Sequence, residues 1–266
     1  MAYIGETWMK TLADRITDWI KDYAVNHGLD SLCVGVSGGI DSAVVSTLCA
    51  RTGLKTFVCS MPIRQKQDQH TLSVDHCIWL LENYDNVHWE THDLTIVFEE
   101  FEKMFPNASG LSMANTRSRL RMTTLYTVAQ NNNGIVVGTG NKVEDFGVGF
   151  FTKYGDGGVD ISPIADLTKT EVWELGRKLD IDQRIIDAEP TDGLWDDGRV
   201  DKDQLGGLTY KDLEHAMYLE EMFKNSANAA EPFTGIEAHE GRLLLQYDQI
   251  RKPNLHKMNS IPVFKK

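Results

Sequence analysis

The chain has 266 residues, of which 41% are hydrophobic and 25% are charged, as in an ordinary globular protein. Its formal net charge of -12 argues against general binding to nucleic acid, which needs a basic surface. No apolar run is long enough to span a membrane, the first residues lack the pattern of a secretory signal, and no Cys-x-x-Cys pair occurs, so we expect a cytoplasmic protein without a membrane partner.

Hydrophobic periodicity predicts alternating helices and strands in the first half of the chain. An amphipathic helix is expected at 6–27, with Trp8 among its apolar residues, and this apolar side suits either the core or a second subunit. The next expected elements are a strand at 31–36, a helix at 41–52 that Gly53 ends, a strand at 55–60, a helix at 68–84 and a strand at 86–91. This order predicts an α/β fold, a Rossmann-like parallel sheet flanked by helices on both faces.

The second half is expected to form one domain with the first, so that a single domain covers 1–266. A turn-rich segment at 106–114 predicts a mobile loop, and the acid-rich stretch at 180–207 predicts a long excursion. Loops as long as 180–207 are usually functional lids or disordered, and we hypothesise that both segments act as lids over a site. The remaining expected elements are helices at 114–130, 169–179 and 210–224, a buried strand at 135–138 and a basic tail from Arg251.

The segment 37–42, Ser-Gly-Gly-Ile-Asp-Ser, lies between a predicted strand and a predicted helix. Strand, glycine turn and helix N-terminus together form a cradle for an anion. No lysine follows the glycines, unlike a Walker loop, so the segment suits holding pyrophosphate with a metal better than moving a γ-phosphoryl group. Asp41 is therefore a candidate magnesium ligand, with a plain helix cap as the alternative.

Further charged residues lie in three other motifs. Arg117 and Arg121 share a helix face while Arg119 points elsewhere, and we interpret the cluster as an anion clamp or a solvated face. Glu144, shortly after the strand at 135–138, is either a second metal ligand or an exposed helix residue. Lys169 begins a helix that Thr168 or Asp166 caps, and the dipole disfavours a cation there, which favours a functional role such as contact with a phosphate.

These motifs, in this order, resemble the N-type ATP pyrophosphatase superfamily and, within it, the NAD synthetase family. The segment 37–42 alone fits several members, including GMP synthetase, argininosuccinate synthetase, asparagine synthetase and tRNA-modifying enzymes. The block GTGNKVE…GFFTKYGDGGVDISPIADLTKTEVWELG is far more specific for NAD synthetase. The resemblance runs from about Leu32 to Lys257, and the Asn115–Arg119 pattern and the Glu189-Pro-Thr191 triplet agree with it.

The resemblance implies a role for each matching residue. Asp41 and Glu144 would bind Mg²⁺ and, with Lys169, form the catalytic group. The residues that would contact deamido-NAD are Arg119, Lys153, Asp160, His256 and Lys257. The residues that would contact ATP are Gly35, Val36, Ser37, Gly38, Gly39, Ile40, Asp41, Ser42, Arg64, Thr139, Lys169 and Thr191.

The resemblance also implies a reaction in two steps. The nicotinate carboxylate of deamido-NAD attacks the α-phosphorus of ATP, and ammonia then attacks the acyl-adenylate to give NAD and AMP. The GTGNKVE form is closer to glutamine-dependent relatives than the GTDHAAE form of many ammonia-dependent ones, yet 266 residues leave no room for a glutaminase domain. Free ammonia is therefore the expected donor, a separate glutaminase stays open, and a homodimer is expected.

Three alternative functions share part of this pattern. A GMP synthetase-like enzyme would share the 37–42 loop, but the TKYGDGG block and the His256-Lys257 pair argue against it. A tRNA-modifying enzyme is disfavoured by the net charge of -12 and by the lack of paired cysteines. A non-catalytic nucleotide sensor is disfavoured because Asp41 and Glu144 are both present.

Overall fold

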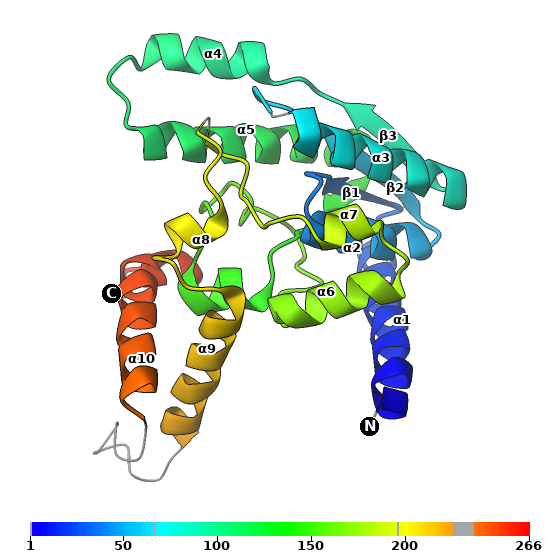
Figure 1. Ribbon diagram of the computed structural model, residues 1–266. Helices are drawn as coiled ribbons and strands as arrows, with labels where there is room; N and C mark the ends of the chain where they lie inside the picture. The colour runs from blue at the N-terminus through cyan, green and yellow to red at the C-terminus, as the bar shows by residue number, and fades with distance from the viewer. Residues whose placement is uncertain (1, 66, 196, 226–236) are drawn as a thin grey trace.

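The structure is a computed structural model that describes residues 2–65, 67–195, 197–225 and 237–266 (Figure 1). Within these ranges, the side chains of 2–11, 67–69 and 225 are not described. The predicted place of Trp8 on an apolar face therefore lies outside the described side chains.

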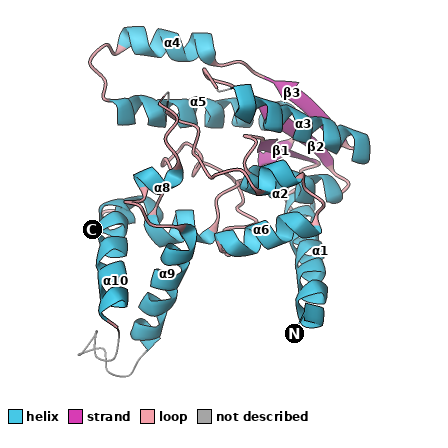
Figure 2. Ribbon diagram, in the orientation of Figure 1, coloured by secondary structure: helices cyan, strands magenta, loops and turns pink. Residues whose placement is uncertain are grey.

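A parallel four-stranded sheet forms the centre of the molecule, with the strand order β3-β2-β1-β4. The strands are β1 (Ser31–Gly35), β2 (Lys55–Ser60), β3 (Val87–Thr91) and β4 (Gly134–Val136), shown in magenta where visible in Figure 2. All three pairings are parallel, and Cys33 pairs with Phe57 of β2 and with Val136 of β4. The predicted α/β fold with a parallel sheet is confirmed.

Helices cover both faces of this sheet, because successive side chains of a strand point to opposite faces. Leu32 and Val34 of β1 join the core formed with α1 (Ala2–Asn26), α2 (Ile40–Arg51), α3 (Gln67–Asn83) and α6 (Lys169–Lys178). Cys33, between them, faces α5 (Gly110–Asn131). All four cysteines are buried and free, which confirms the prediction that they are small buried side chains.

Two expectations for the middle of the chain were wrong. The 106–114 loop is helical from Gly110, because the Ser109 hydroxyl accepts a hydrogen bond from the Ser112 amide at 3.2 Å and caps α5. The helix α4 (Thr95–Met104) was not expected at all. The predicted strand at 135–138 is shorter than expected, since β4 ends at Val136 and Val137 pairs with Ile161 as an isolated bridge.

The C-terminal third forms a second apolar cluster beside the sheet. A π-helical turn, η1 (Val143–Val148), contacts α9 (Tyr210–Asn225) and α10 (Ala238–Arg251), which lie side by side in Figure 1. The chain then forms η2 (Lys252–Asn254) and α11 (Leu255–Met258). The 180–207 excursion contains the short helices α7 (Gln183–Ile186) and α8 (Asp201–Gln204). None of the described helices combines the length and apolarity that crossing a bilayer requires.

Candidate active site

The 37–42 segment forms a hydrogen-bonded turn at the carboxyl end of β1, where ligands of parallel sheets bind. The Ser42 hydroxyl donates to the Gly39 carbonyl at 2.9 Å and lies 3.1 Å from the Ser37 hydroxyl. Gly38 has a φ of 90°, in the left-handed region that favours glycine. The turn therefore leads directly into the N-terminus of α2, as the anion-cradle interpretation requires.

Lys169 brings two carboxylates together beside this turn. Its ammonium donates to Asp41 Oδ2 at 2.6 Å and to Glu144 Oε1 at 3.0 Å. The Lys169 side chain is 3% exposed and both carboxylates are 17% exposed. Glu144 is thus not an exposed helix residue, and the structure joins the three predicted catalytic residues from α2, η1 and α6.

Asn141 is a member of this cluster that the sequence reasoning missed. It is fully buried, and its amide donates to Asp41 Oδ1 at 3.2 Å. Its carbonyl oxygen accepts the backbone amides of Val143 and Glu144, both at 3.1 Å. Asn141 therefore ties Asp41 to the start of η1, and the polar Thr139–Glu144 run after a buried strand was the signal for it.

The charges of the cluster depend on one another. Burial opposes ionisation of Asp41, Lys169 favours it and Glu144 opposes it, and the net pKa of Asp41 is raised. Burial also opposes ionisation of Glu144, but Lys169 and the Tyr210 hydroxyl outweigh it, and the pKa of Glu144 is lowered. Burial opposes the charged form of Lys169, yet the two carboxylates raise its pKa, so the ammonium stays charged.

The start of α6 places Lys169. Thr168, and not Asp166, caps α6, because its hydroxyl accepts from the Glu171 amide at 3.3 Å while Glu171 accepts from the Thr168 amide at 2.9 Å. Asp166 pairs instead with Lys142 at 3.1 Å. Likewise Gly39, not Asp41, occupies the cap position of α2, so Asp41 is not a plain cap.

The basic tail meets the aromatic block at 150–158. Lys257 donates to the Phe151 carbonyl at 2.7 Å and lies 5.0 Å from the centre of its ring. Lys153 donates to the His256 carbonyl at 3.3 Å, and Arg119 donates to the Lys153 carbonyl at 3.3 Å. Four of the five residues predicted to bind deamido-NAD therefore form one connected group.

The other predicted contacts lie in different surroundings. Arg64 pairs with Glu102 at 2.6 Å and Glu99 at 3.2 Å, both on α4. Asp160 accepts the Tyr126 hydroxyl at 3.0 Å and the Val136 amide at 2.8 Å. The Thr191 hydroxyl donates to the Arg199 carbonyl at 3.2 Å within the 180–207 excursion, and Thr139 is half-buried after β4.

The arginines of α5 hold carbonyl groups of neighbouring segments. Arg117, 4% exposed, donates to the Leu194 carbonyl in the excursion, and Arg121 donates to the Met61 carbonyl at 3.1 Å. Burial and the neighbouring Arg117 lower the pKa of Arg121 to about 10. The solvated-face alternative is therefore wrong for Arg117 and Arg121, whereas Arg119 is the more exposed of the three.

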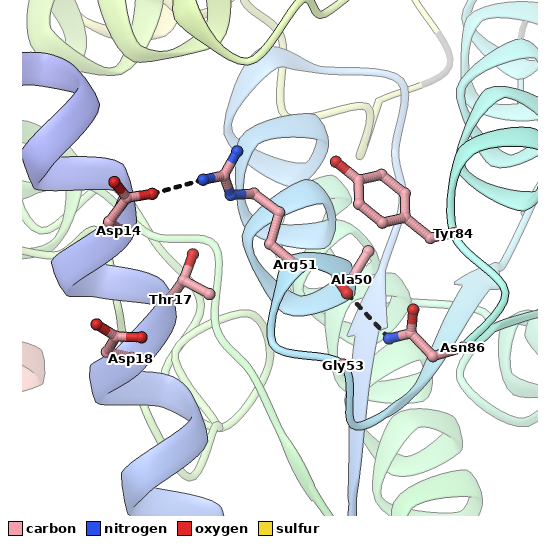
Figure 3. A pocket seen from close by; sticks show the side chains of 8 residues that line it. All are labelled: Asp14, Thr17, Asp18, Ala50, Arg51, Gly53, Tyr84 and Asn86. Carbon is pink, nitrogen blue, oxygen red and sulfur yellow. Dashed lines mark hydrogen bonds and ion pairs between the residues drawn. The ribbon is translucent and has the colours of Figure 1, made fainter.

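A separate hollow of about 670 Å³ lies at the opposite ends of the strands (Figure 3). Two of the residues that line it form an ion pair: the Arg51 guanidinium, in the last turn of α2, lies 2.6 Å from the Asp14 carboxylate of α1. Gly53, just before β2, also lines it. This hollow is distinct from the Lys169 cluster, because the cluster adjoins the carboxyl end of β1.

The residues of the cluster suit a magnesium ion. Carboxylate and amide oxygens are hard ligands, and Mg²⁺ is commonly bound by one or two carboxylates together with water and substrate phosphates. Among the described residues, no group of three or more His, Cys, Asp or Glu side chains could hold a metal ion. Asp41 and Glu144 are the two carboxylates that the Lys169 cluster offers.

The sequence of the chain matches a model of the NAD synthase family over residues 12–260. An NH(3)-dependent NAD(+) synthetase of Alkaliphilus metalliredigens is 39% identical over 233 residues, which are 85% of this chain and 93% of that protein. One from Methanosarcina mazei is 34% identical over 264 residues, 96% and 98% of the two chains. The solved structure of NMN synthetase from Francisella tularensis superposes with a TM-score of 0.82 at 30% identity, covering 97% of this chain and 99% of that chain. Cluster, fold and sequence agree, and the chain belongs to the NAD synthase family.

Proposed function

We propose that the protein is an ammonia-dependent NAD synthetase, which uses ATP to amidate deamido-NAD. The observation that carries this proposal is the Lys169 cluster beside the 37–42 turn, in a chain of the NAD synthase family. A carboxylate becomes reactive toward ammonia only when one of its oxygens turns into a good leaving group. Transfer of adenylate from ATP to the nicotinate carboxylate achieves this, with release of pyrophosphate, and ammonia then displaces AMP.

The 37–42 turn and Lys169 would act on the phosphates of ATP. The turn supplies hydroxyls and the amino end of α2, which favour the negative charge that grows on pyrophosphate as it leaves. Lys169 is charged and buried at the same place, so it can stabilise that charge without reorganisation of water. Asp41 and Glu144 would hold Mg²⁺, which supplies Lewis-acid neutralisation of the phosphate oxygens.

The connected group of Arg119, Lys153, His256 and Lys257 would bind the anionic nicotinate substrate. It concentrates positive charge in a chain whose net charge is -12. Because adenylation requires the carboxylate to meet the α-phosphorus in line, holding the substrate in place supplies much of the catalysis.

A second candidate substrate is the mononucleotide, nicotinate mononucleotide, which would give NMN by the same two steps. The observation that favours this candidate is the similarity to the NMN synthetase structure, at a TM-score of 0.82 and 30% identity. The two substrates share the nicotinate, ribose and one phosphate, and differ in the adenylate half. The Lys169 cluster can act on either substrate. Selection between the two substrates therefore depends on the residues that contact the adenylate half of deamido-NAD.

The test is a parallel assay of both substrates with ATP, Mg²⁺ and ammonium, followed by chromatography of the products. We expect NAD and AMP from deamido-NAD at a higher kcat/KM than NMN from the mononucleotide. Turnover of the mononucleotide alone would move the assignment to an NMN synthetase, and turnover of neither would overturn both. Glutamine in place of ammonium is the matched control for the nitrogen donor, and we expect no product with it.

We further propose that the single domain acts as a cytoplasmic homodimer. Trp19 and Val25 of α1 are 47% and 55% exposed, as apolar side chains at an interface would be in a lone chain. Light scattering of the purified protein at micromolar concentration tests this, and a monomeric mass would contradict it.

A further inference from the structure

The hydroxyl of Tyr210 lies between two carboxylates of different segments. It is 2.6 Å from Glu144 Oε1, in η1, and 2.7 Å from Asp201 Oδ2, at the start of α8. Asp201 is 5% exposed and Tyr210 is 7% exposed. Both distances are those of strong hydrogen bonds involving a charged or acidic group.

A phenol carries one proton and can donate it to only one of these carboxylates. The second short contact therefore needs a proton on a carboxyl group. Glu144 is the ionised partner, because its Oε1 also accepts the Lys169 ammonium at 3.0 Å. Asp201 is the neutral one, since its Oδ1 has no hydrogen-bond partner among the described residues and an ionised oxygen there would be left unsatisfied. Burial, and then the charge of Glu144, raise the pKa of Asp201 to about 7.

The ring of Tyr210 contacts the third member of the cluster as well. The Lys169 ammonium lies 4.7 Å from the centre of the ring, within the range of a cation–π contact. Trp173 of α6 packs edge-on against the same ring, with centroids 6.1 Å apart. Tyr210 therefore touches both Glu144 and Lys169 and is itself held by α6.

Asp201 connects this tyrosine to the 180–207 excursion. Its backbone amide donates to the Pro190 carbonyl at 3.0 Å, and its carbonyl accepts the Leu205 amide at 2.9 Å. Asp201 therefore ties Tyr210 to Pro190 and to Leu205, two residues of the excursion. A chain of hydrogen bonds therefore links the excursion to the Glu144 carboxylate, through Asp201 and Tyr210.

We propose that Asp201, as a neutral acid, and Tyr210 are positioning residues that hold Glu144 and Lys169 in their catalytic arrangement when the 187–205 segment is docked. The proposal rests on the function proposed above, because it assigns these residues to that reaction. Asp201 donates to Tyr210, and Tyr210 donates to Glu144. Neither residue touches the reacting atoms.

The charged and titratable groups that face Asp201 are Glu144 of η1, Lys169 of α6, Asp192 of the excursion and Tyr210 of α9. Loss of its proton would place a second negative charge opposite Glu144 with a single phenolic proton between them. The docked segment is therefore expected to loosen as the pH rises through about 7, the pKa of Asp201.

The experiment compares Asp201→Ala with Asp201→Asn, because the asparagine amide can donate to Tyr210 as a neutral acid does. Tyr210→Phe is expected to raise the KM for MgATP about tenfold, the effect of losing one hydrogen bond to the ionised Glu144. Asp201→Ala removes only a hydrogen bond between neutral groups and is expected to raise this KM about fivefold. Asp201→Asn is expected to recover most of this loss and to remove the decline in activity above neutral pH. Equal loss in the alanine and asparagine variants would overturn the proposal.

Hydrogen exchange of the unliganded variants provides a readout that does not depend on turnover. Asp201→Ala is expected to speed exchange in both 187–205 and η1, and Asp201→Asn in neither. Tyr247→Phe and Asp212→Asn are matched controls, since Tyr247 bonds the Gly147 carbonyl of η1 at 3.1 Å and Asp212 bonds Thr209 at the start of α9. An effect of Tyr247→Phe as large as that of Tyr210→Phe would indicate packing alone and contradict the proposal. If the wild type shows no synthetase activity, the exchange result still stands, so the two failures are distinguishable.

Discussion

Lys169 reaches the cluster from the first turn of α6, and its ammonium contacts carboxylates on two other elements. A cation at a helix N-terminus opposes the helix dipole, by up to about 1 kcal/mol. The two short ion pairs offset this cost at a site that is nearly inaccessible to water. The position is thus unfavourable for α6 alone and favourable only for the assembled cluster.

Replacing Lys169 tests this balance. Lys169→Met leaves Asp41 and Glu144 buried without their cation, so we expect unfolding free energy to fall by about 3 kcal/mol or more and adenylation to be lost. Urea unfolding measures the first effect and pyrophosphate release the second. Lys142→Met is the control, because Lys142 pairs with a largely exposed Asp166 and should contribute under about 1 kcal/mol. Equal stability of the two variants would contradict the assignment.

The buried His76 should make the free energy of unfolding depend on pH, independently of the candidate active site. It is buried against α2, 2.9 Å from the Ser46 hydroxyl, and burial lowers its pKa to about 4. The unfolded chain, with a histidine pKa near 6.5, binds this proton more readily, so stability is lost as the pH falls from 6.5 toward 4. Between pH 7.5 and pH 5 the loss should be about 2 kcal/mol.

Urea unfolding of His76→Gln at both pH values measures this contribution. We expect the variant to lose about 2 kcal/mol less than the wild type over the same interval. His88→Gln, at an exposed histidine, should keep the wild-type dependence. An unchanged dependence in His76→Gln would show that other groups cause the acid sensitivity.

At the scale of elements, sequence periodicity predicted the sheet, because a buried strand such as β1 is a continuous apolar run between turn residues. It did not predict α4, whose interval received no assignment. It placed the start of α5 too late, since Pro106, Asn107 and Gly110 look like loop residues while the Ser109 cap that begins the helix is a single side-chain contact.

Some residues of the candidate site were likewise predictable from the sequence and others were not. Asp41, Glu144 and Lys169 were predictable, because each lies in a motif with its own local signal. Tyr210 was not, because it lies 66 residues from Glu144 along the chain, and a helical tyrosine carries no mark of that contact. The predicted ATP contact of Arg64 stays a prediction, since its guanidinium forms ion pairs with Glu99 and Glu102 of α4.

Gly149 tests how the tail is placed against η1. Its φ is 67°, and a Cβ atom there would lie 2.7 Å from the Asn254 Cβ and 2.8 Å from the Met258 side chain. We expect Gly149→Ala to cost about 1–3 kcal/mol and to raise the KM for the nicotinate substrate more than that for ATP, because it displaces the segment that carries His256 and Lys257.

The control for this substitution is Gly53→Ala. Gly53 has a φ of 75° with no atom within 4 Å of the added Cβ, so the change introduces backbone strain without crowding. We expect lower stability and unchanged KM values, measured by thermal unfolding and initial rates. A shift in KM for the nicotinate substrate in Gly53→Ala would mean that strain alone accounts for the effect at Gly149.

At the scale of the whole molecule, the 180–207 excursion runs from α7 toward α5 and returns to α8, as the ribbon in Figure 1 shows. Arg117 donates to the Leu194 carbonyl, Trp195 lies against Gly110, and Arg199 stacks 3.9 Å from the Trp195 ring centre. The segment therefore bridges the helices of the sheet and the helices of the C-terminal third. This arrangement supports its predicted role as a lid that keeps water from an adenylate.

Hydrogen exchange with and without substrates tests the lid. We expect MgATP with deamido-NAD to slow exchange across 187–207, because bound substrate favours the docked segment. The helix α4, at the edge of the molecule, should exchange at the same rate in both conditions. Identical rates for 187–207 in the two conditions would rule out a substrate-coupled lid.

The ammonium of Lys169 has one more consequence, for preparation and storage of the protein. A carboxylate pair with a tethered counter-cation does not require a divalent ion to remain folded, unlike domains whose folding depends on a structural metal. Exhaustive dialysis against a chelator should leave the melting temperature unchanged while abolishing synthesis, and readdition of magnesium should restore activity without refolding. A melting temperature lowered by chelation would show that a metal ion stabilises the fold.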